Sequence, residues 1–263
     1  MTQGNKFLNL IENICRSNIY LFIISRYIVG RYLSKFIFDA DFKIIKLLNQ
    51  KKYFKKSSLV IDIGANDGGA YSICRKFLPK KTKIVSFEPI YSNFKILEKF
   101  KRQDKFLKCF NVSVSNKLKK KNFYTPYFKE FSLTQFSGLD RKQIDSRLKK
   151  SLFIKNILKK IQYKKTIIET KTLDSFKLKP AFLKLDIEGH EYKCILGSLE
   201  TIKKNAPIIM VEYDKKICDK IFKILLKYKY ERFIYNKMKN KIEKFNNQEI
   251  MNIFFIKKNL NIL

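Results

Sequence analysis

The stretch Leu59-Val-Ile-Asp-Ile-Gly-Ala-Asn-Asp-Gly68 decides the fold. It is a short apolar run that ends in small, turn-forming residues. Apolar and β-branched residues ahead of Gly64 are typical of a buried parallel strand. Gly64, Ala65 and Gly68 leave room for a ligand against the backbone, and Gly68 stands where a helix would open with its free N–H groups facing that ligand. The stretch therefore predicts a strand, a turn that binds a nucleotide-like cofactor, and a helix.

Strands and helices alternate after this stretch. The pattern predicts strands at 59–63, 83–87, 106–112, 166–170, 181–186, 207–213, 230–235 and 251–256. The helices expected between them lie at 68–78, 91–102, 191–205 and 215–228. Such alternation indicates βαβ units and a mostly parallel sheet of about seven strands. Residues 116–165 interrupt it with a Lys-rich segment that contains a helix near 141–161, and this segment is too long for an ordinary loop.

The N-terminal residues 1–55 are predicted to form a helical extension, and residues 56–263 the main domain. The run Ile19–Phe38 is hydrophobic, but three basic residues interrupt it, namely Arg26, Arg31 and Lys35. A membrane-spanning helix needs about 20 mostly apolar residues, so a basic amphipathic helix explains the run better. We expect its apolar face on the main domain, with peripheral contact to an anionic membrane as the alternative.

The composition is strongly basic, with 57 Lys and Arg against 23 Asp and Glu and a formal net charge of +34. This charge suggests nucleic acid as a partner. However, only eight basic residues are Arg and the chain has five Ala, whereas Lys, Asn, Ile and Phe abound, which indicates AT-rich coding. The five cysteines form no Cys-x-x-Cys pair, a pattern typical of reduced thiols. We expect a cytoplasmic protein, with membrane-peripheral attachment as the alternative.

The turn after β-branched Ile63 can be compared with known cofactor-binding patterns. No Gly-Lys-Ser/Thr follows, which excludes a Walker loop, and the three-glycine dinucleotide pattern is absent. The form Asp62-x-Gly64-x-x-x-Gly68 matches the methyltransferase pattern. Val85-Ser-Phe-Glu-Pro89 then ends the next strand with a carboxylate, Glu88, that can accept both ribose hydroxyls. A ribose-containing cofactor is predicted, and this spacing alone leaves both NAD and S-adenosylmethionine open.

A third motif, Phe182-Leu-Lys-Leu-Asp-Ile-Glu-Gly-His-Glu-Tyr192, places a strand before three acids and the only histidine of the chain. At the carboxyl end of a central strand such groups face the ligand crevice. Together with the turn and Phe87-Glu88-Pro89, this motif resembles the FkbM family of S-adenosylmethionine-dependent methyltransferases. The resemblance runs over about residues 58–213 and includes Thr172-Leu-Asp-Ser175 and Ile208–Tyr213.

The resemblance implies a class I methyltransferase fold, which is a Rossmann-like, seven-stranded α/β sheet with its last strand antiparallel. It also implies methyl transfer from S-adenosylmethionine, usually to oxygen. The cofactor-binding residues that it implies are Asp62, Gly64, Ala65, Asn66 and Gly68 along the methionine moiety, Glu88 with Pro89 at the ribose, and Val112 and Ser113 near the adenine. Asn116 departs from the family pattern, which often has an acid there.

Methyl transfer to a hydroxyl requires an aligned acceptor, exclusion of water and removal of a proton. Asp186 and Glu188 are the expected proton acceptors or hydroxyl ligands, with Lys184 as their electrostatic partner on the same strand face. His190 is another candidate base, and Glu212 is expected in the substrate pocket. Asp186 and Glu188 could bind a divalent metal, but the sequence shows no third ligand, so no metal site is predicted.

Three functions compete at this point. The first is O-methylation of a hydroxyl on a sugar, polysaccharide or glycolipid precursor, with residues 116–165 as a lid or acceptor wall; the acceptor rests on the family resemblance. The second is RNA methylation, suggested by the charge and by the aromatic run Phe123–Phe128. The third is a non-catalytic binding or membrane-docking module, suggested by the basic N-terminal helices.

Overall fold

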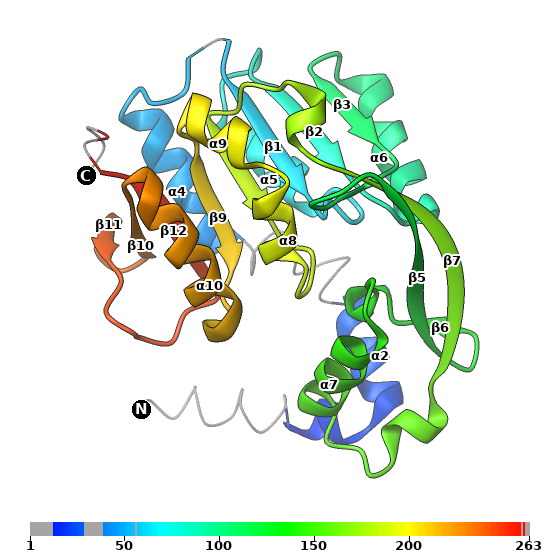
Figure 1. The fold of residues 1–263 in the computed structure, drawn as a ribbon. Helices are drawn as coiled ribbons and strands as arrows, with labels where there is room; N and C mark the ends of the chain where they lie inside the picture. Colours follow the sequence, from blue (N-terminus) through cyan, green and yellow to red (C-terminus); the bar gives the residue numbers. More distant parts are fainter. Residues whose placement is uncertain (1–12, 29–38, 56, 259, 261–263) are drawn as a thin grey trace. The chain divides into compact units, whose positions relative to one another are not determined.

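The computed structural model describes residues 13–28, 39–55, 57–258 and 260. The chain forms two compact units, each assembled from two separate stretches. The first unit comprises Met1–Ser34 and Lys121–Ile167, and the second comprises Lys35–Lys120 and Ile168–Leu263. Two long strands, β5 (Lys119–Phe128) and β7 (Gln162–Lys171), carry the chain from one unit to the other (Figure 1).

The second unit is built on an eight-stranded sheet in the order β11-β10-β12-β9-β8-β1-β2-β3. The parallel pairs join β1, β2, β3, β8 and β9, whereas β12 is antiparallel to both β9 and β10. The strands are β1 (Leu59–Ile63), β2 (Lys83–Phe87), β3 (Leu107–Phe110), β8 (Phe182–Leu185), β9 (Ile208–Glu212), β10 (Tyr230–Asn236), β11 (Lys241–Lys244) and β12 (Asn252–Lys257).

This sheet confirms the mostly parallel α/β fold expected from the sequence. The expected number of seven strands is wrong, because β11 pairs antiparallel with β10 and adds an eighth strand at the edge. Its residues Lys241-Ile-Glu-Lys244 include a single apolar side chain. Without an apolar alternation a strand of this kind leaves little signal, and pairing with its neighbour forms it.

Helices cover both faces of this sheet. On one face, α4 (Asp39–Gln50) and α5 (Gly69–Phe77) pack against alternate strand residues such as Val60 and Phe182, with α6 (Tyr91–Gln103) beside α5. On the other face, α8 (Glu191–Leu196), α9 (Leu199–Asn205) and α10 (Lys215–Leu225) pack against the intervening residues, including Ile61 and Leu183. Successive strand residues point to opposite faces, so both layers are filled by the same apolar strands.

The first unit has an apolar core of its own. Ile19 and Phe22 of α2 (Ile19–Ile28) pack with Phe136, Ile144 and Leu148. The other elements of this region are β6 (Phe131–Ser132), the 3₁₀ turns η2 (Thr134–Phe136) and η3 (Ile157–Lys160), and α7 (Arg141–Ser151), whose N-terminus is capped by Asp140. Residues 121–167 are therefore a folded subdomain joined by α2, whereas α4 belongs to the second unit.

Several elements differ from the sequence pattern. The strand expected at 166–170 is part of the longer β7, which pairs in a separate four-stranded sheet and not in the large one. The helix expected at 215–228 ends at Leu225. The expected helix 191–205 is broken into α8 and α9 at Gly197, where a Cβ would lie 2.0 Å from the carbonyl oxygen of Ser115. The expected helix 141–161 ends at Ser151, and the third strand ends at Phe110. Two further 3₁₀ turns are η4 (Asp174–Phe176) and η5 (Leu226–Tyr228), and β4 (Ser113–Val114) pairs with β7.

The hydrophobic N-terminal run is described only as far as α2, and its second half, residues 29–38, lies outside the described residues. Among the helices that the structure does describe, none has the length and apolar character needed to cross a bilayer.

Candidate functional site

The turn after β1 lies directly against the end of β8. Gly64 has a φ of +81°, and a Cβ there would lie 1.9 Å from the carbonyl oxygen of Asp186. The N–H groups of Gly64 and Ala65 both donate to the carbonyl of Phe87 at the end of β2. Only glycine combines this left-handed conformation with so close an approach. The turn is thus fixed between the carboxyl ends of β2 and β8.

Glu88 holds the next part of the turn through hydrogen bonds to its backbone. Its carboxylate accepts the N–H of Asn66 at 2.9 Å on one oxygen and the N–H of Ile90 at 2.8 Å on the other. Asn93 of α6 donates its amide to Asn66 Oδ1 at 2.6 Å, which holds Asn66 at a φ of 48°. Burial raises the pKa of Glu88 to about 7, against the lowering effect of the two backbone donors. The expected ribose carboxylate is therefore buried and preorganised beside the turn.

The remaining expected cofactor residues lie around this carboxylate. Gly68 precedes α5 with a φ of 88°, and a Cβ there would meet the Phe100 ring at 2.8 Å. The amide of Asn111 donates to the carbonyls of Glu88 and Pro89, which ties the end of β2 to the segment after β3. In that segment Val112 and Ser113 are both buried. They follow β3 rather than ending it, because Ser113 begins β4.

A buried ion pair lies beneath the turn. Lys184 of β8 is opposite Asp62 of β1, and its Nζ is 3.0 Å from Asp62 Oδ1, 3.4 Å from the carbonyl oxygen of Gly64 and 3.3 Å from Asp186 Oδ2. Burial by itself lowers the pKa of Lys184, but the carboxylates of Asp62 and Asp186 together outweigh it and raise that pKa. Lys184 thus joins the two central strands through a charged bridge.

A buried acid, Glu191, fixes the backbone conformation of the loop after β8. Glu188 and Gly189 have φ values of 54° and 92°, so two successive residues are left-handed. Glu191, at the start of α8, accepts the N–H groups of Ile187 and Gly189 on Oε1 at 3.2 and 3.1 Å. Burial raises the pKa of Glu191 to about 7. This carboxyl, counted among the three acids of the motif but not among the expected site residues, shapes the loop that carries Asp186, Glu188 and His190.

His190 has a partner that the sequence pattern did not indicate. Its Nε2 lies 2.9 Å from the hydroxyl oxygen of Ser115, which is fully buried, and the hydrogen bond orients the imidazole ring. Ser115 is in turn held by its own N–H, which donates to the carbonyl of Lys171. Ser115 and His190 are 75 residues apart, so no local motif links them.

Three carboxylates meet at the carboxyl ends of β8 and β9. Asp186, Glu188 and Glu212 each offer an oxygen, and these oxygens lie within 4.8 Å of one another. The sequence indicated no third metal ligand for Asp186 and Glu188, and Glu212 of the neighbouring strand β9 lies in that place. Carboxylate oxygens arranged in this way are ligands that hard divalent cations favour. They can also accept the proton of a hydroxyl group. The expected substrate-pocket residue Glu212 and two expected catalytic residues are therefore brought together, beside the Gly64 turn.

Comparison with solved structures agrees with this fold. A methyltransferase FkbM from Methylobacillus flagellatus superposes with a TM-score of 0.50 at 13% identity, over 77% of this chain and 44% of that chain. This chain thus spans less than half the length of that relative. The chain is also similar to an S-adenosylmethionine-dependent O-methyltransferase from Thermotoga maritima, with a TM-score of 0.40 and 10% identity over 82% of this chain and 64% of that chain. An rRNA methylase from Streptococcus thermophilus has a TM-score of 0.41 and 8% identity over 82% of this chain and 93% of that chain.

No curated protein matches this chain at a significant level. The sequence matches the family model described as the methyltransferase FkbM domain over residues 62–234. The match begins at the carboxylate of β1 and includes the Gly64 turn, Glu88, the loop from Asp186 to His190, and Glu212. It covers well over half of the 263 residues, and the fold is that of the class I methyltransferases. The chain therefore belongs to the FkbM methyltransferase family.

Proposed function

We propose that this protein is an S-adenosylmethionine-dependent O-methyltransferase whose acceptor is a hydroxyl on a sugar, polysaccharide or glycolipid precursor. One observation carries the proposal, namely the contact between the Gly64 turn and the carbonyl of Asp186, where only a hydrogen atom fits. This contact places a turn suited to the cofactor directly beside a loop of candidate proton acceptors. Methyl transfer needs these two halves side by side.

The residues around the turn fit S-adenosylmethionine. Asp62 Oδ2 is buried and has no hydrogen-bond partner among the described residues, and a methionine ammonium is a donor that would satisfy it. Each oxygen of Glu88 accepts one backbone N–H, so each keeps a lone pair for a ribose hydroxyl. Hydroxyl donors would offset the cost of burying this carboxylate. In the proposal Val112 and Ser113 form the adenine side of the site.

When bound, S-adenosylmethionine supplies a methyl group on a sulfonium. The residues of the chain orient the acceptor and take its proton. Asp186 and Glu188 accept the proton or hold the hydroxyl, and His190, positioned by Ser115, is the second candidate base. Lys184 is buried and holds the Asp186 carboxylate at 3.3 Å, so its role is to position that carboxylate.

Mass spectrometry on the full chain tests the proposal. The protein is incubated with S-adenosylmethionine and a panel of neutral sugars, polysaccharide fragments and glycolipid precursors, and products carrying one added methyl group are sought. Glu88→Gln should weaken cofactor binding, and Asp186→Asn should slow transfer while cofactor binding is retained. Lys83→Ala, at the opposite end of β2, is the matched control that should keep both.

Two further arms separate the alternatives. Transfer to RNA but to none of the sugars would favour the RNA hypothesis. Adding EDTA shows whether the three carboxylates act without a divalent cation. If calorimetry detects no binding of S-adenosylmethionine to the wild-type protein, the proposal is wrong.

A further inference from the structure

We infer that the acceptor is larger than one sugar ring, and that a neutral sugar unit next to the reacting one lies in a cavity at the carboxyl edge of the large sheet. This inference rests on the proposed function and names the acceptor class for the same site. The inference is drawn from the size of the cavity, from the residues that line it, and from its position beside the acidic cluster, which is Asp186, Glu188 and Glu212.

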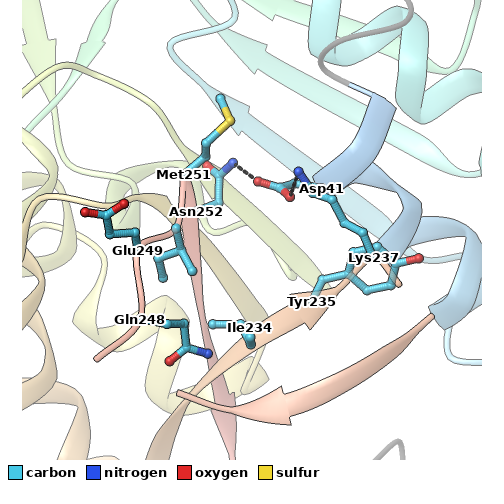
Figure 2. A pocket seen from close by; sticks show the side chains of 9 residues that line it. Asp41, Ile234, Tyr235, Lys237, Gln248, Glu249, Met251 and Asn252 are labelled. Atoms are coloured by element: carbon cyan, nitrogen blue, oxygen red, sulfur yellow. Dashed lines mark hydrogen bonds and ion pairs between the residues drawn. The ribbon is translucent and has the colours of Figure 1, made fainter. Parts of the chain in front are cut away.

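The cavity has a volume of about 480 Å³ and belongs entirely to the second unit. Its size is in the range of small-molecule sites. Figure 2 shows Gln248 and Glu249, from the segment before β12, across from Asp41 of α4 and Lys237. Tyr235 and Asn252 complete the polar part of the lining. The cavity therefore lies where β10 ends and β12 begins.

This place is next to the acidic cluster. Asn252 is directly opposite Glu212 in the antiparallel pair of β12 and β9. Opposed residues of such a pair present their side chains on the same face, with Cβ atoms about 4.5–5.5 Å apart. Glu212 also belongs to the cluster with Asp186 and Glu188. Glu212 is therefore a common neighbour of the cavity and of the candidate proton acceptors.

The distance between these places sets the length of the acceptor. β12 is separated from β8, which leads into Asp186, by two strand spacings of about 4.8 Å, or about 10 Å in total. A single pyranose ring is shorter than this span. A ligand that reacts beside Asp186 and also fills the cavity must therefore have at least two linked rings.

The lining favours a neutral, hydroxyl-rich ligand. Its charged side chains are two acids, Asp41 and Glu249, and one base, Lys237, although the chain carries a net charge of +34. A second cavity of about 340 Å³, at the amino ends of β1 and β2, is lined by five lysines and no acid. The first cavity thus lacks the excess of positive charge that a phosphate-rich ligand such as RNA requires.

The cavity lining contains both hydrogen-bonding groups and apolar side chains, a combination that suits a sugar. Asp41 accepts the Asn252 amide at 2.7 Å and lies 3.1 Å from Lys237 Nζ, so donors and acceptors stand together. Sugar hydroxyls can both donate and accept, which suits such a set. Met251 is 56% exposed and offers an apolar surface for the C–H face of a ring.

Ligand-detected NMR tests the inference on the full chain with S-adenosylhomocysteine bound. The probes are neutral methyl glycosides, the disaccharides that contain the same rings, and disaccharides in which one ring is a uronate. We expect the best neutral disaccharide to bind about tenfold more tightly than its monosaccharide, and the uronate form more weakly. Glu249→Gln and Met251→Ala are exposed changes that should remove about fivefold of the disaccharide affinity and leave that of the monosaccharide unchanged.

Lys83→Ala, in the lysine-lined cavity, is the control and should change neither affinity. Equal binding of mono- and disaccharides, or an unchanged disaccharide affinity in both cavity variants, would each overturn the inference while the methyltransferase proposal stands. Cofactor binding without any sugar binding would overturn the inference and the proposed sugar acceptor, but not the use of S-adenosylmethionine. Failure of the wild-type protein to bind S-adenosylhomocysteine and S-adenosylmethionine would instead overturn both.

Discussion

Substituting Gly64 by alanine should separate the cofactor turn from the catalytic loop. The new Cβ would lie 1.9 Å from the carbonyl oxygen of Asp186, whereas an unstrained contact is about 3.5 Å. The two backbones must therefore move apart by about 1.5 Å. Asp186 is also held by Lys184 at 3.3 Å, so this movement strains the buried ion pair as well.

The free-energy cost has two parts. Alanine at a φ of +81° costs about 1–2 kcal/mol, because its Cβ crowds the following carbonyl. Overpacking against Asp186 adds about 1–3 kcal/mol. The sum, about 2–5 kcal/mol, is a large part of the free energy of unfolding of an ordinary domain.

Gly69→Ala is the matched control. Gly69 opens α5, and a Cβ there would lie 3.7 Å from Asp67 Oδ1, an ordinary contact. The free energy of unfolding of the Gly69→Ala variant should equal that of the wild-type protein or exceed it by up to about 1 kcal/mol. Urea denaturation measures both variants, and calorimetry should show that only Gly64→Ala lowers the affinity for S-adenosylmethionine, by about tenfold or more. If the two variants unfold at the same urea concentration and bind the cofactor equally, the close contact has no energetic role.

Three further predictions concern the buried charges. Lys184→Met leaves the Asp62 carboxylate buried without its partner and should cost about 3–5 kcal/mol, whereas Asp62→Leu combined with Lys184→Met should recover most of that loss in a double-mutant cycle. The affinity for S-adenosylmethionine should fall about tenfold between pH 8 and pH 6, because Glu88, with a pKa of about 7, must be ionised to accept ribose hydroxyls; Glu88→Gln should remove this dependence in calorimetric titrations. The pKa of Glu191 is raised from 4.5 to about 7, so between these pH values the folded state keeps a proton that the unfolded state has lost. The contribution of Glu191 to the free energy of unfolding should therefore be largest below pH 4.5 and fall by about 3 kcal/mol as the pH rises to 7. Denaturation of Glu191→Gln across this pH range should show a shallower decline than wild type, and an identical decline would contradict the assignment.

Much of the fold could be predicted from local sequence. β1 and β2 have the predicted bounds, because each is an apolar run that ends at a turn or a carboxylate. The edge strand β11 could not be predicted, since its Lys-rich residues become a strand only by pairing with β10. The helix break at Gly197 lies beside a second long-range contact, because the carbonyl of Ser115 approaches Gly197 so closely that no residue with a Cβ would fit, and local sequence does not show this approach.

The candidate site divides in the same way. Asp62, Glu88 and the loop from Asp186 to His190 stand at strand ends, where sequence pattern places ligand-facing groups. Ser115, which orients His190, and Glu212, which completes the carboxylate cluster, come from other strands or loops. Their proximity depends on the strand order rather than on any local spacing.

The sequence by itself determined that a parallel α/β sheet carries a cofactor turn and an acidic loop, because the residues of each motif are contiguous and their apolar periodicity is a local property. Only the tertiary structure decided that these motifs touch. Asp62 and Lys184 are 122 residues apart, and they meet because β1 and β8 are neighbours in the sheet. Strand order results from the packing of the whole core, so the contacts that create the site are a property of the folded chain alone.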